Sequence, residues 1–136
     1  MIRPIMRSVD FLRQPSEEAT LEDLETARDL ADTLKAHADE CVGMATNMIG
    51  VKKRIIVFEE NGKPVIMINP RILRADGAYQ AVEGCLSLVG ERQAKRYKSI
   101  KVQYLNEKMQ LRLKTYKDRT AQIIQHELDH LEGILI

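Results

Sequence analysis

The sequence predicts an α+β domain in which a helix, several antiparallel strands and a second helix follow one another. Three observations support this order. Apolar residues recur at helical spacing near the N-terminus, short runs rich in β-branched residues and separated by turn signals fill the middle, and helical spacing returns near the C-terminus. The length of 136 residues suits a single domain over residues 1–136.

The first helix is predicted from about Leu21 to Glu40. Its apolar residues recur three or four positions apart, at Leu21, Leu24, Ala27, Ala31, Leu34 and Ala38. Thr20 precedes it as an N-cap residue, and Asp23 stands where a capping-box partner is expected. Residues 1–20 mix charge, proline and isolated apolar residues, so we expect an extended arm that packs onto the body.

The middle of the chain is predicted to form three antiparallel strand pairs. They are 55–59 with 64–68, 71–75 with 78–82, and 99–105 with 109–115. Asn61-Gly62 and Asp76-Gly77 are strong hairpin signals for the first two pairs, and the third turns near Asn106. The last helix is expected from Asp118 or Thr120 to Leu131, with Gly133 as its C-terminal stop.

Composition narrows the classes of function. With 21 Lys+Arg against 20 Asp+Glu, a net charge near +1 gives no reason to expect nucleic acid or an anionic membrane as a partner. No apolar run reaches the length of a membrane span, and the N-terminal residues lack a secretory signal. We therefore expect a cytoplasmic protein whose two cysteines are reduced thiols.

The strongest functional signal is His126-Glu127-Leu128-Asp129-His130, inside the last predicted helix. Residues four apart on a helix share a face, so both imidazoles can bind one transition metal while Glu127 handles a proton beside it. The alternative is a pair of surface histidines on a charged helix.

A catalytic metal usually has three protein ligands and an open position for water. The candidate third ligand is Cys85 in Glu83-Gly84-Cys85-Leu86-Ser87, at the end of a predicted strand. Taken alone, such a cysteine is more often a buried core thiol. A third stretch, Cys41 to Val51, has two glycines among small and apolar residues, and Met44 and Met48 would by themselves be assigned to the core.

Together the three stretches resemble the signatures of the peptide deformylase family. These are a segment of the form G-apolar-G-apolar-A-A-x-Q, then E-G-C-apolar-S, then Q-H-E-x-D-H. The second and third match completely, at Glu83 to Ser87 and Gln125 to His130. The resemblance implies antiparallel sheets packed around a C-terminal metal-binding helix, and a hydrolase that removes the formyl group from the formyl-methionine of nascent polypeptides. A location near the ribosome is a further expectation.

The resemblance also implies roles for individual residues. Cys85, His126 and His130 would bind one divalent ion, with a water as fourth ligand; Fe(II) is usual, and zinc, nickel or cobalt can replace it. Glu127 would move the proton, and the Leu86 N–H would point at the oxyanion. The substrate-binding residues would be Val42, Gly43, Met48, Glu83 and Arg92. Asp129 would be held by a salt bridge, with Arg96 as its expected partner.

The chain departs from the first signature at three positions. Met48 replaces a glutamine that donates to the oxyanion, and a thioether cannot donate. Loss of one such donor costs about 10²–10³ in rate in other hydrolases, so we expect weakened activity. Thr46 replaces the second alanine, and Cys41 replaces the first glycine, as either a fourth metal ligand or a buried thiol.

Arg119 and Gln122 stand where family members carry apolar residues, which implies a more polar side-chain pocket. Two alternative functions remain open at this point. One is a catalytically impaired metal-binding or peptide-binding protein. The other is a general metallopeptidase, against which Cys85 argues because such enzymes normally use a carboxylate or a third histidine.

Overall fold

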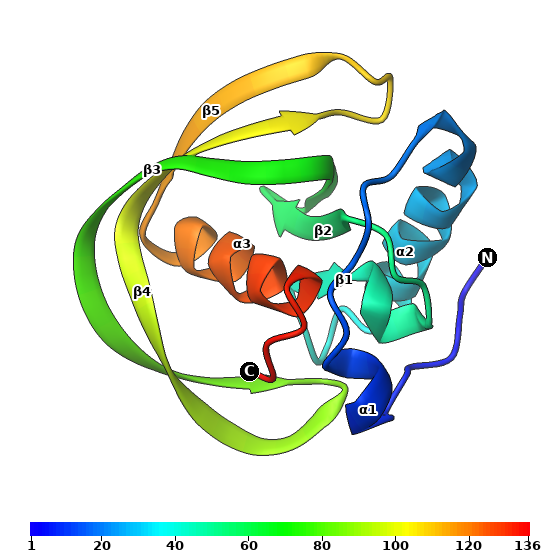
Figure 1. Ribbon diagram of the computed structural model, residues 1–136, viewed down its shortest axis with the longest axis horizontal. Helices are drawn as coiled ribbons and strands as arrows, with labels where there is room; N and C mark the ends of the chain where they lie inside the picture. Colours follow the sequence, from blue (N-terminus) through cyan, green and yellow to red (C-terminus); the bar gives the residue numbers. More distant parts are fainter.

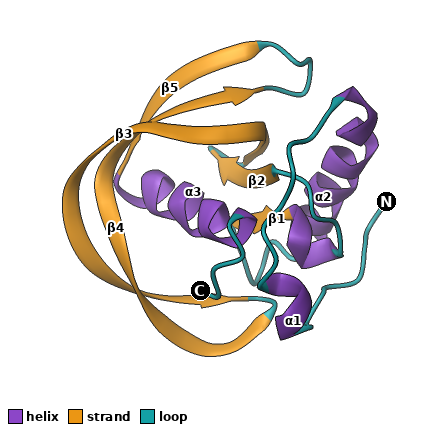
Figure 2. Cartoon of the chain, in the orientation of Figure 1, coloured by secondary structure: helices purple, strands orange, loops and turns teal.

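The computed structural model describes residues 1–136 and contains a five-stranded antiparallel sheet in the order β1-β2-β3-β4-β5. The strands are β1 (Gly43–Ala45), β2 (Ile55–Glu60), β3 (Lys63–Cys85), β4 (Leu88–Leu105) and β5 (Leu111–Lys117). The helices are α1 (Val9–Leu12), α2 (Leu24–Ala36) and α3 (Asp118–Leu131), with 3₁₀ turns η1 (Leu21–Asp23) and η2 (Thr46–Ile49). β3 and β4 curve around α3, and α2 lies beyond β1 and β2 (Figure 1, Figure 2). The predicted α+β architecture around a C-terminal helix is confirmed.

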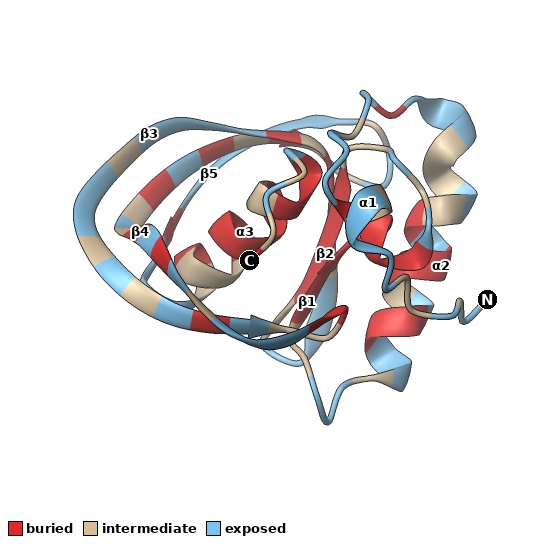
Figure 3. Cartoon of the chain, turned by 60° about the horizontal axis from the view of Figure 1, so that its bottom comes forward, coloured by how far each residue is buried: buried red, intermediate tan, exposed pale blue.

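Strand β2 separates two apolar cores because its residues point alternately to opposite faces. Ile56 and Phe58 face α3 and pack in one buried cluster with Ile124 and other residues of that helix. Ile55 and Val57 point the other way, into a second cluster with α2. Figure 3 shows the buried residues gathered on α3, β1, β2 and one side of α2. The position of α3 is thus set by burial along one whole side of the helix.

Several local signals are confirmed. Asn61 and Gly62 have φ of 53° and 77° and join β2 to β3. Thr20 and Asp23 form the predicted capping box. Gly133 has φ of 76° and ends α3, and a Cβ there would lie 2.3 Å from the carbonyl oxygen of Arg13. Both the conformation and the contact require glycine at this position.

The second predicted hairpin is wrong. Residues 71–75 and 78–82 belong to the single strand β3, and Asp76 pairs with Ser99 of β4 across the expected turn. Gly77 keeps the left-handed conformation of a turn residue, with φ of 80°, although it lies inside the continuous strand β3. Pairing with β4 over most of its length outweighs the local turn signal. The true turn is Leu86-Ser87, since Cys85 pairs with Leu88.

Other boundaries shift by a few residues. The helix predicted from Leu21 to Glu40 is α2, which ends at Ala36, in keeping with the unfavourable position of Asp39 and Glu40 at a helix C-terminus. β5 begins at Leu111 rather than Met109, which has a positive φ of 59°.

The N-terminal segment packs onto the body as expected, although it contains the unpredicted α1. The Met6 N–H donates to the Met48 carbonyl at 2.7 Å, and the Ser16 N–H donates to the Leu131 carbonyl at 2.8 Å. The arm therefore contacts both η2 and the end of α3. None of the helices is long and apolar enough to cross a lipid bilayer.

Candidate metal centre

Helix α3 presents the two histidines and the glutamate of the motif on the side next to its apolar face. Ala121, Ile124, Leu128 and Leu131 anchor the helix in the core. His126, Glu127 and His130 are consequently buried as well, with exposed fractions of 8%, 4% and 0%. Buried polar groups of this kind need partners, which the neighbouring strands supply only in part.

The turn between β3 and β4 brings Cys85 to this helix. The ligand atoms of Cys85, His126 and His130 all lie within 4.8 Å of one another. The Nε2 atoms of the two histidines are 3.1 Å apart, close to the separation of about 3.3 Å expected for two nitrogens on a tetrahedral ion. The predicted thiolate and imidazole set is thus assembled with dimensions that fit one divalent transition metal.

Glu83 fixes the orientation of His126. Its Oε1 lies 2.8 Å from His126 Nδ1, so a charged carboxylate makes Nδ1 the donor and directs Nε2 toward Cys85 and His130. Gln122 donates to the other oxygen of Glu83 at 2.9 Å. We predicted Glu83 as a substrate contact, but both of its oxygens are bound inside the protein. Its geometry is that of a positioning residue.

Arg96 joins this carboxylate to the end of α3. It donates to Glu83 Oε1 through Nη2 at 2.7 Å and to Asp129 Oδ2 through Nη1 at 2.7 Å, so the predicted Arg96–Asp129 ion pair is present. Although burial opposes it, bonds from His126, Arg96 and Gln122 hold the pKa of Glu83 down at about 2. Glu83 is therefore ionised at any physiological pH.

The pKa values of the two histidines are shifted in opposite directions. Burial opposes protonation of His126, but its bonds to Cys85 and Glu83 raise its pKa to about 10. Burial, together with the positive charge on His126, lowers the pKa of His130 to about 3. Since a metal binds neutral imidazoles, binding of a cation has to displace the His126 proton.

Glu127 lies beside the ligand cluster, and one of its carboxylate oxygens lacks a hydrogen-bond partner. Its Oε1 is buried and has no partner in the protein. Burial raises its pKa to about 7, with the nearby His126 charge acting in the opposite direction. A carboxylate with a pKa near neutrality can both accept and release a proton at physiological pH.

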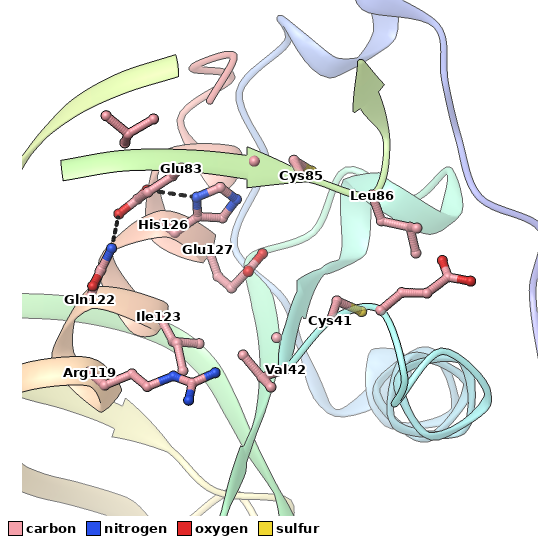
Figure 4. Close-up of a pocket in the computed structure, with 14 residues that line it drawn as sticks. Cys41, Val42, Glu83, Cys85, Leu86, Arg119, Gln122, Ile123, His126 and Glu127 are labelled. Carbon is pink, nitrogen blue, oxygen red and sulfur yellow. Dashed lines mark hydrogen bonds and ion pairs between the residues drawn. The ribbon is translucent and has the colours of Figure 1, made fainter. Parts of the chain in front are cut away.

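A cavity of about 590 Å³ opens onto this cluster (Figure 4). Its walls come from the end of β3, the segment before β1, and α3. It is lined by Glu40, Cys41, Val42, Gly43, Val82, Glu83, Gly84, Cys85, Leu86, Arg119, Gln122, Ile123, His126 and Glu127. The predicted residues Val42, Gly43 and Leu86 therefore lie at the cavity together with Cys85, His126 and Glu127.

Gly43 allows the cavity wall to approach α3 closely. A Cβ at this position would lie 2.8 Å from Ile123 Cγ2 and 3.1 Å from Glu127 Oε2. Any side chain there would displace one of these groups. Close packing against Ile123 and Glu127 therefore requires glycine at position 43.

Two predicted substrate contacts do not lie at the cavity. Met48 is 1% exposed and packs in the apolar cluster beside α2, as suits an unbranched side chain without a donor. Arg92 is half-buried, and its Nη1 donates to the Val89 carbonyl at 3.4 Å. Neither residue lines the cavity.

Cys41 does not complete a closed four-ligand centre. Its thiol faces the His37 carbonyl, with the sulfur 3.7 Å from that oxygen, and it lies outside the cluster of ligand atoms. Burial and the neighbouring Glu127 raise its pKa to about 12, so it stays a neutral thiol. Cys41 is thus a half-buried thiol that lines the cavity and lies outside the group of ligand atoms.

Sequence reasoning did not find the positioning role of three residues, one of which, Gln122, was expected only to make the side-chain pocket more polar. Gln122 supports Glu83, and Asn47 donates to the His130 carbonyl at 2.8 Å from the far side of α3. Arg7 donates to the Leu86 carbonyl at 2.9 Å. Gln122, one turn before His126, could have been found by helical spacing. Nothing in the local pattern around Arg7 or Asn47 indicates a partner so distant in the chain.

Comparisons with known proteins agree with this geometry. The family model described as polypeptide deformylase matches residues 2–136. A peptide deformylase of Clostridium beijerinckii is 52% identical over 136 residues, covering 100% of both chains. One of Dictyoglomus turgidum is 42% identical over 112 residues, covering 80% of this chain and 71% of that one.

Solved structures give the same result for the fold. The crystal structure of peptide deformylase from Thermotoga maritima superposes with a TM-score of 0.89 at 32% identity, covering 99% of this chain and 95% of the other. A Met-Ala-Ser-bound class I type b peptide deformylase from Acinetobacter baumannii gives 0.88 at 26% identity, covering 99% and 97%. Together with the Cys85, His126 and His130 cluster, these similarities show that the chain belongs to the peptide deformylase family of metallohydrolases.

Proposed function

We propose that this chain removes the formyl group from the N-terminal formyl-methionine of nascent polypeptides. The observation that carries the proposal is that the ligand atoms of Cys85, His126 and His130 lie within 4.8 Å of one another, and that Cys85 and His126 line one cavity together with buried Glu127. Family membership over nearly the whole chain supports the same activity. We further propose that residues 1–136 act as one domain, because both chain ends pack onto the same body.

Cys85, His126 and His130 would hold one divalent ion, for which Fe(II) is our first choice and zinc, nickel or cobalt are substitutes. When bound, such an ion polarises a carbonyl oxygen and lowers the pKa of water toward neutrality. Glu83 keeps the His126 ring in its binding orientation through the 2.8 Å contact with Nδ1. Arg96 in turn holds Glu83 in place.

Glu127 is the proposed proton carrier. Its free Oε1 and raised pKa suit it to take a proton from the attacking water and to pass it to the amine nitrogen as the formyl C–N bond breaks. The products are formate and a peptide with a free amino terminus. His126 and Cys85 would stay bound to the ion and take no part in proton transfer.

The backbone would orient the substrate. Leu86 lies outside the strands, and none of the backbone bonds made by turns and loops uses its N–H, so this group can donate to the formyl oxygen. Val42 and Gly43 line the opposite wall, where an extended peptide can pair with exposed backbone. The related structure with bound Met-Ala-Ser supports a peptide that begins with methionine as the product of this reaction.

We propose that activity is weakened relative to enzymes with a glutamine at position 48, since the Met48 side chain offers no donor. Because nascent chains are the proposed substrate, we place the enzyme in the cytoplasm and near the ribosome. No membrane or nucleic acid is needed for this activity.

The test is formate release from formyl-Met-Ala by iron-loaded, oxygen-protected protein, with metal content measured on the same sample. Glu127→Ala should lower the rate by about 10²–10⁴ while keeping the metal. A wild-type rate no higher than that of Glu127→Ala would overturn the proposal and leave a metal-binding or peptide-binding protein. Cleavage of internal bonds in unblocked peptides would instead support a general metallopeptidase.

A further inference from the structure

The cavity continues along α3 away from the metal cluster. Ile123, Gln122 and Arg119 precede His126 by three, four and seven residues, so all four share one helix face and all line the cavity. Seven residues correspond to about 10 Å along the helix axis. The cavity therefore has a reactive end at His126 and a second end at Arg119.

Arg119 is an unpaired cation at that second end. It makes no salt bridge, and no hydrogen bond of its guanidinium to the protein is found. Its side chain extends from α3 below Ile123, and the guanidinium points toward Val42 across the cavity (Figure 4). The donors of Arg119 thus face the space that a substrate would enter.

None of the carboxylates that line the cavity neutralises this cation. Glu83 is bound by Arg96, His126 and Gln122. Glu127 is buried beside the metal ligands, and the carboxylate of Glu40, which lies 3.8 Å from His37 Nδ1, forms no salt bridge with Arg119. Arg119 is left with its charge free for a ligand.

We propose that Arg119 is a specificity-determining residue that binds a carboxylate on the first side chain of a formylated peptide. The proposal rests on the proposed deformylase function. With the formyl carbon at the metal cluster, the first side chain is the closest substituent and must enter the cavity along α3. The enzyme would then hydrolyse formyl-glutamyl peptides as well as formyl-methionyl ones.

The reach of the groups agrees with this assignment. A formyl amide and an extended glutamate side chain together span roughly 7 Å from the formyl carbon to the carboxylate. The distance from that carboxylate to the start of α3 is within the length of an arginine side chain. The planar guanidinium of arginine can donate two parallel hydrogen bonds to a carboxylate. The aliphatic part of Arg119, beside Ile123, still offers an apolar wall to methionine.

The experiment compares kcat/KM for formyl-Met-Ala-Ser, formyl-Glu-Ala-Ser and formyl-Gln-Ala-Ser on iron-loaded wild type, Arg119→Leu and Arg119→Lys. Wild type should prefer the glutamyl to the glutaminyl peptide. Arg119→Leu should lower kcat/KM for the glutamyl peptide about tenfold more than for the methionyl peptide, and Arg119→Lys should retain part of the preference. The matched control is Arg112→Leu on β5, outside this cavity, which should leave all ratios unchanged.

Three results would overturn the inference while leaving the proposed function intact. They are release of formate from the methionyl peptide alone, equal rates for the glutamyl and glutaminyl peptides in wild type, and an equal loss on every peptide in Arg119→Leu. Formate from none of the three peptides would refute the proposed function itself. Arg119 is exposed, so a thermal melt matching that of wild type is expected for each variant and shows that specificity rather than folding has changed.

Discussion

The two walls that hold Glu127 and the metal cluster are built by different physical means. On one side, Glu83, Arg96, Gln122 and Asp129 hold His126 through a network of charged hydrogen bonds. On the other, Gly43 meets Ile123 and Glu127 by close packing alone. The first wall should respond to pH and to loss of charge, and the second to changes in volume. This difference shows which kind of substitution each wall can tolerate.

The side formed by Glu83, Arg96, Gln122 and Asp129 is called the charged wall here, and the side formed by Gly43 and Ile123 the packed wall. Replacing Arg96, the centre of the charged wall, should have the largest effect on stability. Arg96→Met leaves Glu83 and Asp129 without their shared cation, and breaking a buried pair in this way costs about 3–5 kcal/mol of folding stability. Metal affinity should also fall, because His126 loses part of its support. Urea unfolding and metal titration measure both effects. Arg74→Met, which removes an exposed ion pair with Asp76, should change stability by less than about 1 kcal/mol.

Overfilling the packed wall should have the next largest effect. Gly43→Ala places a Cβ against Ile123 and Glu127, which should cost about 1–3 kcal/mol and lower kcat as Glu127 moves. Adding Ile123→Ala should restore part of both losses, since it removes Cγ2, the atom that the new Cβ would contact. Gly84→Ala is the control, because the nearest atom to its Cβ would be 3.7 Å away. A kcat for Gly43→Ala equal to that of wild type would show that Glu127 tolerates displacement.

The charged wall should also weaken in acid. The pKa of Glu83 is lowered from 4.5 to about 2 in the folded protein, so its contribution to stability is complete above pH 4.5 and is lost as the pH falls through 2. The stability difference between wild type and Glu83→Gln should therefore shrink over this window. Urea unfolding of metal-free protein at a series of pH values measures it. A difference that stays constant down to pH 2 would contradict an ionised Glu83 in the network.

Met48→Gln, in the apolar cluster beside α2, should lower stability about as much as Gly43→Ala, and its distinguishing effect should be on the rate. Cys85 and Leu86 pack against the same apolar cluster as Met48, so an amide there could donate toward the formyl oxygen and raise kcat. Burying the amide should cost about 1–3 kcal/mol. Met67→Gln, in the cluster beside α3, should lose similar stability without any gain in rate. An unchanged kcat would mean that Met48 does not limit the reaction.

Local patterns in the sequence were enough to predict one half of the site. His126, Glu127 and His130 follow from helical spacing, and their positions require only that the helix forms. Cys85 was assigned as the third metal ligand only through the family resemblance. A lone cysteine beside a glycine does not by itself indicate that it lies next to histidines about forty residues away in the sequence. The ion pair between Arg96 and Asp129 was predicted in the same way and is present.

The remaining features depend on contacts between distant segments. The signal at Asp76-Gly77 was read as a hairpin because local turn preference cannot reveal that β3 pairs with β4 across it. The burial of Met48 and the bond from Asn47 to the His130 carbonyl depend on where η2 packs relative to α2 and α3. Only the assembled chain determines these positions.

The bond between Ser16 and Leu131 and the contact of Gly133 with Arg13 link residues more than one hundred positions apart. During translation, the N-terminal arm therefore cannot make these contacts until almost the whole of residues 1–136 has left the ribosome. The same holds for the reactive centre, since His126 and His130 lie near the end of this sequence. High contact order of this kind predicts slow folding. The active geometry is the last thing this polypeptide acquires, and shortened chains that lack α3 would have neither the imidazoles nor the apolar core that α3 forms with β2.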